Sequence, residues 1–437
     1  MGKGLISRKI SFGFIAGITS IGIDGIAGLI VLPMLIKFLS EEIAGIWLFF
    51  ISFTVLIRLG QAGLAPVVTR ISAKLKSTYS SLEVNNSIWA TVKWSYSIAT
   101  LLVILICSVI YVFYIYFVLK EQNFILQGTL CWLLLSVSFM LRIYFIKYFH
   151  LINGFGEVGW DKFIQIFIAL INLIGFYLVL KLDFGFWSLG AVYLLSGIIF
   201  SFFAKITFNR LNKGYIITKS SYTTVKEVMS MFSESGKILI LNITSFIVLQ
   251  SNFFVIERLI GLEVIPYYAG LQRVTTLILA VSGMVTTMMY PFISQKFAQN
   301  DVNGMLQLVK RNVVISLSVA SLLSVVVFIA APILFPLWLG EGSYLGANIF
   351  GPMLILVILY VNHNAFANSI IATGANTFII PAIINACLTL PLSIFGGIQY
   401  GLQGIVVANL IALVLPSFYV VVWSIKYLKA LKLNYND

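Results

Sequence analysis

The fold of this chain is decided by residues 11–70, which read SFGFIAGITSIGIDGIAGLIVLPMLIKFLSEEIAGIWLFFISFTVLIRLGQAGLAPVVTR. The stretch predicts two long apolar helices joined by a short acidic turn at residues 39–42. Each predicted helix carries one charge near its middle, Asp24 in the first and Arg58 in the second. Both charges lie roughly 15 residues, or about 22 Å at 1.5 Å per residue, from the turn. In two antiparallel neighbours these opposite charges would therefore lie at the same depth.

Such charges are costly in an apolar environment. A single Arg or Asp at the centre of a bilayer costs about 3 kcal/mol on the insertion scale, so it normally faces a partner or a water-filled cavity. Asp24 and Arg58 therefore predict a polar lumen inside a helical membrane protein, and a lumen indicates transport. A structural pair that only fixes helix packing is the alternative.

The composition of the whole chain supports a membrane location. Of its 437 residues, 60% are hydrophobic and 10% are charged, whereas a soluble domain carries about 25% charged residues. The chain is therefore expected to be an all-α polytopic membrane protein. Its three cysteines, Cys107, Cys131 and Cys387, all fall in apolar runs, which predicts small buried side chains rather than a disulfide framework or a metal site.

Segments long enough to cross the hydrocarbon, about 20 residues each, number about twelve. They are predicted at residues 11–38, 43–67, 88–118, 124–146, 163–181, 184–206, 236–257, 264–291, 311–336, 346–372, 376–396 and 402–425. Lys and Arg concentrate in alternate loops, which places both termini in the cytoplasm. The net charge of +13 is spread over these loops, so it does not indicate nucleic-acid binding.

The spans divide into two similar halves. The longest polar interval, residues 207–235, is the predicted cytoplasmic linker between lobes at residues 1–206 and 236–437. Short patterns recur in order about 220 residues apart: ITS at 18–20 and 243–245, and ISxK at 71–74 and 293–296. Both halves start on the cytoplasmic side, so the two six-helix bundles are expected to be related by an axis along the membrane normal. Transporters often hold substrate between such repeats.

Further basic residues lie in or near the predicted spans. Arg273 is in span eight, whereas Arg142, Lys147 and Lys93 lie near the inner ends of spans. If they face one lumen, that lumen is cationic and suits an anionic substrate such as a pyrophosphate, which arginine can bind through two parallel hydrogen bonds. For Arg142, Lys147 and Lys93 we instead expect side chains that extend to the inner lipid headgroups.

Uncharged polar residues form a second set of candidates. Gln250 and Asn252 interrupt span seven, and Asn364 and Asn368 lie one turn apart in span ten. Amide groups suit sugar hydroxyls, but they also serve as ordinary hydrogen bonds between membrane helices. His363, beside these asparagines, is either a proton-coupling residue or simply a hydrogen-bonded one.

Two further amides, Asn385 and Asn409, lie in spans eleven and twelve. They have the same two interpretations.

Motifs for nucleotide or metal chemistry are not convincing in this chain. GFGEVG at residues 154–159 fits G-x-G-x-x-G, but a dinucleotide site needs it between a strand and a helix. Here it forms a short turn between two spans.

The chain resembles the polysaccharide-exporter branch of the MATE-like superfamily, which includes O-antigen and other lipid-linked oligosaccharide flippases. The resemblance rests on the six-plus-six arrangement, the apolar stretch Arg8–Ile30, FLSEEIAGIW at residues 38–47, LGQAGL at residues 59–64 and the segment Ala269–Arg273. It implies two lobes arranged in a V around a central lumen. It also implies movement of an undecaprenyl-pyrophosphate-linked oligosaccharide from the inner to the outer leaflet of the bacterial inner membrane, as in O-antigen and lipopolysaccharide assembly.

The resemblance further implies roles for the candidate residues. Arg58 and Arg273 are expected to hold the pyrophosphate, and the remaining substrate-binding candidates are Asp24, Gln250, Asn252, Asn364 and Asn368. No cofactor is expected. Coupling to a gradient of H⁺ or Na⁺ through Asp24 or His363 stays open, as does association with a polymerase and other polysaccharide-assembly proteins.

Two other functions compete with the flippase. A cation-coupled multidrug exporter of the same fold would use Asp24 as its ion site and would favour cationic drugs. An oligosaccharide polymerase would need a sizeable outer loop with catalytic residues, and every predicted outer loop is short. The sequence therefore predicts a transporter rather than an enzyme.

Overall fold

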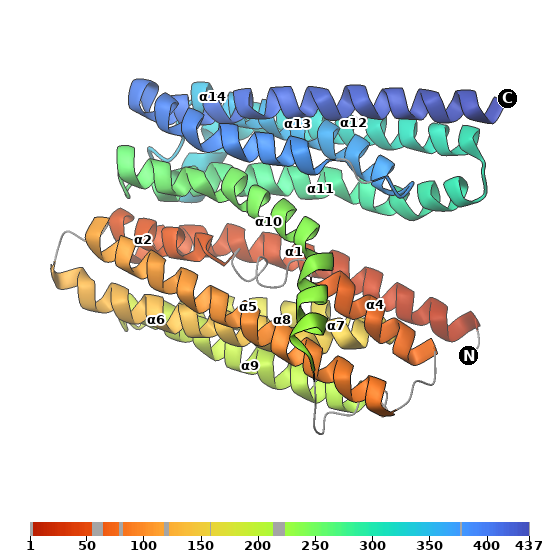
Figure 1. Ribbon diagram of the computed structural model, residues 1–437. Coiled ribbons are helices and arrows are strands. Elements are labelled where there is room, and N and C mark those ends of the chain that lie inside the picture. The colour runs from red at the N-terminus through yellow and green to blue at the C-terminus, as the bar shows by residue number, and fades with distance from the viewer. Residues whose placement is uncertain are drawn as a thin grey trace. The chain divides into compact units, whose positions relative to one another are not determined.

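The computed structural model describes residues 3–54, 64–77, 82–117, 122–157, 159–212, 223–375 and 378–436. Every regular element within these ranges is a helix (Figure 1). The helices are α1 Lys3–Phe38, α2 Glu41–Ser52, α4 Leu64–Ser77, α5 Leu82–Phe117, α6 Gln122–Phe145, α7 Lys147–Gly154, α8 Trp160–Lys181, α9 Trp187–Leu211, α10 Val225–Leu259, α11 Ile265–Ala298, α12 Val302–Leu339, α13 Ala347–Ile371 and α14 Ile379–Asn436. The predicted all-α class is confirmed.

Ten of the described helices are long and apolar enough to cross a membrane. The longest, α14, contains Gly401 with φ 59° and ψ −142°, where two helices meet at a kink. It therefore carries both of the spans predicted at residues 376–396 and 402–425. The span predicted at residues 43–67 includes α2 and the start of α4, but residues 55–63 lie outside the described part of the chain. The chain is a multi-pass membrane protein.

The predicted turn after the first span is confirmed. Helix α1 ends at Phe38 and α2 begins at Glu41. The Oγ atom of Ser40 accepts a hydrogen bond from the backbone N–H of Ile43 at 3.3 Å, which is the usual role of an N-cap serine. Glu41 and Glu42 in the first turn of α2 also favour a helix start here, because they complement the positive end of the helix dipole.

The helices pack into two compact units. The first comprises residues 1–43 and 50–242, and the second comprises residues 44–49 and 243–437. In the first unit α1 packs on α8, α4 packs on α7, and α6 packs on α9. In the second unit α11, α12 and α13 pack on one another, and α13 packs on α14.

Small residues let α6 and α9 approach closely in the first unit. A Cβ atom added to Gly190 of α9 would lie 2.6 Å from the carbonyl oxygen of Cys131 in α6. One added to Gly197 would lie 3.3 Å from the Cα atom of Ser138. The hydroxyl of Ser138 donates to the carbonyl of Tyr193 across the same seam at 2.8 Å. Small residues and a hydrogen bond replace the hydrophobic effect, which is weak between helices in lipid.

An apolar core in the second unit lies where the turn between α11 and α12 meets the end of α13 and the two halves of α14. Its largest buried members are Ile293, Met305, Ile370, Phe378 and Leu428. Each comes from a helix end or a helix flank rather than from one continuous stripe. The core therefore ties four helices together at one end of the unit.

Other faces remain apolar but uncovered. Val109 of α5 is 69% exposed, and Ile329 and Leu337 of α12 are 72% and 82% exposed. A soluble protein rarely exposes contiguous apolar surface of this kind. Lipid covers such surface in a membrane protein, so α5 and α12 supply lipid-facing surface to the two units.

Candidate functional site

The first polar site lies in the first unit, around Arg142 of α6. Its guanidinium donates from Nη2 to the Oγ atom of Ser196 in α9 at 2.7 Å. The guanidinium carbon lies 5.1 Å from the centre of the Tyr193 ring and 5.8 Å from the centre of the Phe200 ring. The Ser196 hydroxyl in turn donates to the carbonyl of Tyr193 at 2.8 Å. Aromatic faces and a hydroxyl thus stabilise a cation at this position.

Asp24 of α1 belongs to the same region. Both its carboxylate and the Arg142 guanidinium act electrostatically on the hydroxyl of Tyr193. We call Asp24, Arg142, Tyr193 and Ser196 the Arg142 cluster. Sequence reasoning paired Asp24 with Arg58 instead, and Arg58 lies outside the described residues. That pairing stays a prediction.

The expectation that Arg142 and Lys147 extend to lipid headgroups is wrong. The guanidinium of Arg142 is engaged by α9, as described above. Lys147 is completely buried, and its Nζ atom lies 2.8 Å from the centre of the Tyr144 ring. Ile146 keeps helical dihedral angles between α6 and α7, so the physical reason is the covered face of the helix, where the Lys147 amine lies near the rings of Tyr144 and Tyr148. There the electron-rich face of an aromatic ring takes the place of a headgroup.

His150 in α7 was not among the predicted site residues. Its Nδ1 atom is hydrogen-bonded to the hydroxyl of Tyr96 in α5, and its carbonyl accepts from the Thr69 hydroxyl of α4 at 3.1 Å. These bonds join three helices of the first unit. The sequence holds one signal for this site. His150 follows Lys147 by three residues, so the two side chains lie on the same face of the helix.

The second polar site lies in the second unit, where the amide of Asn252 in α10 joins three other side chains. Its Nδ2 atom donates to the Tyr268 hydroxyl of α11 at 3.0 Å. Its Oδ1 atom accepts from Asn409 Nδ2 at 2.9 Å and from the Ser393 hydroxyl at 3.5 Å. We call these four residues the amide cluster. Its bonds join α10, α11 and both halves of α14.

The amide cluster borders a cavity of about 80 Å³. The cavity is lined by Val248, Leu249, Asn252, Tyr268, Gln272, Thr275, Thr276, Leu279, Met353, Leu356, Val357, Tyr360 and Asn409. A water molecule takes about 30 Å³ of liquid volume, so the cavity holds only a few waters. It offers donors and acceptors but no charge, and it is far too small for an oligosaccharide.

Of the residues predicted to bind substrate, Asn252 alone is among the residues that line this cavity. Gln250 is also in α10, and its Oε1 atom is buried with no hydrogen-bond partner in the described part of the chain. Asn368 donates to the backbone carbonyl of Asn364 at 2.9 Å within α13. Arg273 is half-buried in α11, next to the lining residue Gln272. The structure does not gather these residues around one described cavity.

His363 lies in α13, beside Asn364. Its Nδ1 atom is buried and has no hydrogen-bond partner within the described residues. Its coupling role stays a prediction.

The cysteine predictions are partly confirmed. Cys107 and Cys131 are buried free thiols, whereas Cys387 is exposed, so the prediction of burial is wrong there. Cys387 lies on an outward side of α14, where an apolar environment comes from lipid rather than from other helices. Among the described residues, no three His, Cys, Asp or Glu side chains gather as a metal site.

Comparison with known proteins places the fold. No protein-family model and no curated protein matches the chain. An inward-facing multidrug resistance MATE family transporter of the MOP superfamily matches with a TM-score of 0.74 and 13% identity, over 99% of both chains. Lipid II flippase MurJ in an inward closed conformation matches with a TM-score of 0.74 and 16% identity, over 98% of this chain and 90% of its own. The Vibrio cholerae MATE transporter VcmN in its bent form matches with a TM-score of 0.60 and 13% identity, over 98% of this chain and 97% of its own.

These matches cover almost the whole chain at low identity. They confirm the MATE-like architecture that the sequence resemblance implied. The chain has the fold shared by MATE transporters of the MOP superfamily and the lipid II flippase MurJ.

Proposed function

We propose that this protein is a flippase that moves an undecaprenyl-pyrophosphate-linked oligosaccharide repeat unit, of an O-antigen or a similar surface polysaccharide, to the outer leaflet. The fold is shared with a lipid II flippase over nearly the whole length. The proposed site of action is the bacterial inner membrane, with both termini in the cytoplasm. The proposed mechanism is transport by alternating access, which needs neither catalysis nor a cofactor.

The observation that carries the proposal is the charge balance of the spans. Of the 15 acidic residues in the chain, only Asp24 and Glu257 fall in the predicted spans. Arg58, Arg142 and Arg273 lie inside predicted spans, and Arg311 is the first residue of another. Intramembrane charges of this kind mark substrate pathways. An excess of arginine suits a pyrophosphate, because the planar guanidinium matches phosphate oxygens with two parallel hydrogen bonds.

The glycan part of the substrate needs a different set of partners. Sugar hydroxyls lose water on entering hydrocarbon, and each one left without a partner costs several kcal/mol, roughly 2–7 depending on the reference. The amide side chains of Gln250, Asn364 and Asn368 would replace that water. The lipid tail would stay in the bilayer while the polar part crosses. A polymerase and other polysaccharide-assembly proteins are the natural partners of such a step.

A cation-coupled multidrug exporter is the second proposal. A MATE family transporter matches with the same TM-score as MurJ, so the fold does not choose between the two. Asp24 favours this alternative, because a carboxylate within a membrane-spanning helix is suited to bind H⁺ or Na⁺. The three arginines weigh against cationic drugs.

The test compares cells that contain and lack this protein. Polyprenyl-linked glycans are extracted and quantified together with surface polysaccharide. A flippase predicts accumulated lipid-linked single repeat units and lost surface polymer when the protein is absent. Restoration by the wild-type protein, but not by the Arg58→Ala/Arg273→Ala variant, would support the arginine assignment. Unchanged glycans together with increased sensitivity to cationic drugs would favour the exporter instead.

Matched variants separate a binding role from general damage. Arg273→Lys keeps the charge and is expected to retain more transport than Arg273→Ala. Arg311→Ala removes an exposed arginine near the start of α12 and is expected to behave like wild type. Full activity of both Arg58→Ala and Arg273→Ala would overturn the pyrophosphate site.

A further inference from the structure

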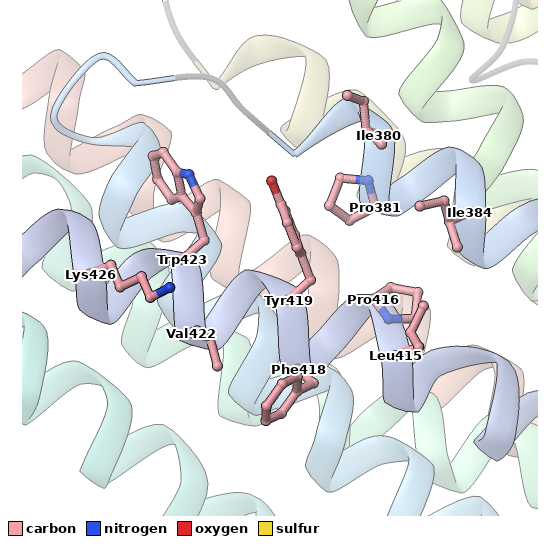
Figure 2. A pocket seen from close by; sticks show the side chains of 10 residues that line it. All are labelled: Ile380, Pro381, Ile384, Leu415, Pro416, Phe418, Tyr419, Val422, Trp423 and Lys426. Carbon is pink, nitrogen blue, oxygen red and sulfur yellow. The ribbon is translucent and has the colours of Figure 1, made fainter.

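A groove of about 420 Å³ lies between the two halves of α14, before and after Gly401 (Figure 2). It is lined by Ile380, Pro381, Ile384, Leu415, Pro416, Phe418, Tyr419, Val422, Trp423 and Lys426. Ligand sites in proteins typically enclose about 300–1,000 Å³. The groove therefore has room for a ligand, which the 80 Å³ cavity beside the amide cluster does not.

The walls of this groove, which we call the α14 groove, suit a hydrocarbon chain. Pro381 and Pro416 are buried and line it from opposite halves of the helix (Figure 2). At the rim, Ile380, Leu415 and Phe418 are 66%, 62% and 70% exposed. Apart from the Tyr419 hydroxyl, the Trp423 N–H and the Lys426 amine, the lining side chains are hydrocarbon. An occupant must therefore be apolar over most of its length.

One end of the α14 groove is held in place by aromatic contacts. The ring of Trp423 stacks on that of Tyr427 with centroids 5.2 Å apart, and it meets the edge of Phe378 at 5.7 Å. The Tyr427 hydroxyl is hydrogen-bonded to the Thr373 hydroxyl at 3.2 Å. Tryptophan and tyrosine of this kind concentrate at the boundary between hydrocarbon and lipid headgroups. This end therefore lies at headgroup level, and the rest of the groove extends into the hydrocarbon.

That end of the α14 groove carries positive charge. Lys426, the only cation among the lining residues, is exposed, and within the described chain no carboxylate pairs with it. The sequence between residues 342 and 436 contains no Asp or Glu, so neither α13 nor α14 can supply one. Lys429 and Lys432 follow on the same helix and add to the positive charge. An anionic lipid headgroup would complement this positive charge.

We propose that the α14 groove binds one anionic glycerophospholipid of the bilayer. Its acyl chain lies over Pro381 and Pro416, and its phosphate accepts hydrogen bonds from the Lys426 amine. A long apolar groove with one cation at its headgroup end matches this amphipathic shape. The inference does not depend on which substrate the protein transports, because the groove is formed by α14 alone.

The test is native mass spectrometry of the full-length protein, purified in detergent and incubated with equal amounts of phosphatidylglycerol and phosphatidylethanolamine. We expect one phosphatidylglycerol to be retained in preference to phosphatidylethanolamine. Lys426→Ala should lower the retention of phosphatidylglycerol about ten-fold, since a hydrogen bond to a charged group is worth at least that factor. Leu415→Trp should expel the acyl chain by filling the groove. Both positions are exposed, so neither change disturbs the core.

Two control variants match these changes. Lys310→Ala removes an exposed lysine of α12, and Ile411→Trp adds the same bulk at a position one turn from Leu415 that is 57% exposed and outside the groove. Both should retain the lipid like wild type. Equal retention of the two lipids, or loss of phosphatidylglycerol in the control variants to the same degree, would overturn the proposal. So would stronger retention of an added polyprenyl phosphate, which would assign the groove to the tail of a transported substrate instead.

Discussion

The Nδ2 atom of Asn409 donates to the Oδ1 atom of Asn252 at 2.9 Å, which joins α14 to α10 across 157 positions of sequence. Asn409 Nδ2 also faces the backbone carbonyl of Ile405 at 2.7 Å. Both amides are nearly inaccessible, with 6% and 5% exposure for Asn252 and Asn409. The pair therefore joins two helices inside the second unit by a bond that water does not reach.

Asn252→Ala and Asn409→Ala are expected to be non-additive. Each should lower the free energy of unfolding by about 1 kcal/mol, the usual scale of interhelical hydrogen bonds in membrane proteins. The double variant should cost less than the sum, because either change removes the same bond. Unfolding by sodium dodecyl sulfate in mixed micelles measures the free energy of unfolding of the two single variants and of the double variant. Asn348→Ala, which breaks an exposed bond to Gln403, is the control with little expected effect. Strict additivity would contradict the pairing.

Arg142 and Ser196 allow a test of whether the Arg142 cluster serves folding or transport. Ser196→Ala removes the acceptor of the guanidinium, and a hydrogen bond to a charged group is worth about 1.5–3 kcal/mol. Arg142→Met removes the charge while keeping much of the volume, so we expect a smaller loss of stability. Thermal unfolding in detergent measures both. Ser201→Ala is the control, since that hydroxyl donates only within α9, to Gly197.

Transport assays of Arg142→Met and Ser196→Ala separate a packing role of Arg142 from a role in substrate contact. If Arg142 contributes only to packing, Arg142→Met should transport as well as wild type. If it contacts substrate, transport should fall although the protein remains folded. A result in which Arg142→Met unfolds more readily than Ser196→Ala would contradict the energetic argument.

Gly190→Ala is expected to separate α6 from α9. The new methyl group would lie 2.6 Å from the Cys131 carbonyl oxygen and 3.0 Å from its Cα atom. Backbone atoms cannot move aside as a side chain can, so a cost of about 1–3 kcal/mol follows from overpacking. Gly283→Ala in α11, where a Cβ atom would meet nothing within 4 Å, should be neutral or slightly stabilising. Equal stability of the two variants would show that the α6–α9 seam is looser than described.

Asp301 predicts a pH dependence outside the membrane. Its carboxylate accepts from Lys296 Nζ at 2.6 Å and from the backbone N–H of Gly304 at 2.8 Å. These bonds hold the pKa of Asp301 below its ordinary value. Because the pKa is lower in the folded state, the stabilisation is present above the unfolded pKa of about 3.9 and is lost as the pH falls through the folded pKa.

Melting temperatures of wild type and Asp301→Asn measure this effect. The difference between them should be largest near neutral pH and should shrink as the pH falls below about 4. Lys310→Ala, which changes a charge elsewhere on α12, should show no such convergence. A constant difference at all pH values would contradict the linkage.

Asp24→Asn tests the ion-coupling hypothesis. The variant keeps the shape and the hydrogen-bonding capacity of the side chain but removes its charge. If Asp24 couples transport to H⁺ or Na⁺, uptake or flipping should lose its dependence on the gradient. Reconstituted vesicles with an imposed gradient, compared with vesicles without one, provide the measurement. Unaltered gradient dependence would exclude Asp24 and leave His363 as the next residue to change.

The helices could be predicted from sequence because local signals mark them. Apolar length set the spans, and Ser40 with the two glutamates after it marked the start of α2. The buried position of Lys147 could not be predicted, since it depends on which face of its helix the neighbouring helices cover. Likewise, Asn252 was a candidate from its type alone. Its partner Asn409 could not be chosen among the amides of the later spans without the fold.

Gly401 has a consequence for mutation. Its backbone, at φ 59° and ψ −142°, occupies a region that side chains with a Cβ atom almost never adopt. A Cβ atom there would meet nothing within 4 Å, so the restriction comes from conformation and not from space. Every codon change that alters this amino acid therefore imposes the same backbone penalty, whatever the size or polarity of the new side chain. In a saturation library, position 401 should tolerate glycine alone, whereas exposed Leu415 nearby should accept many residues.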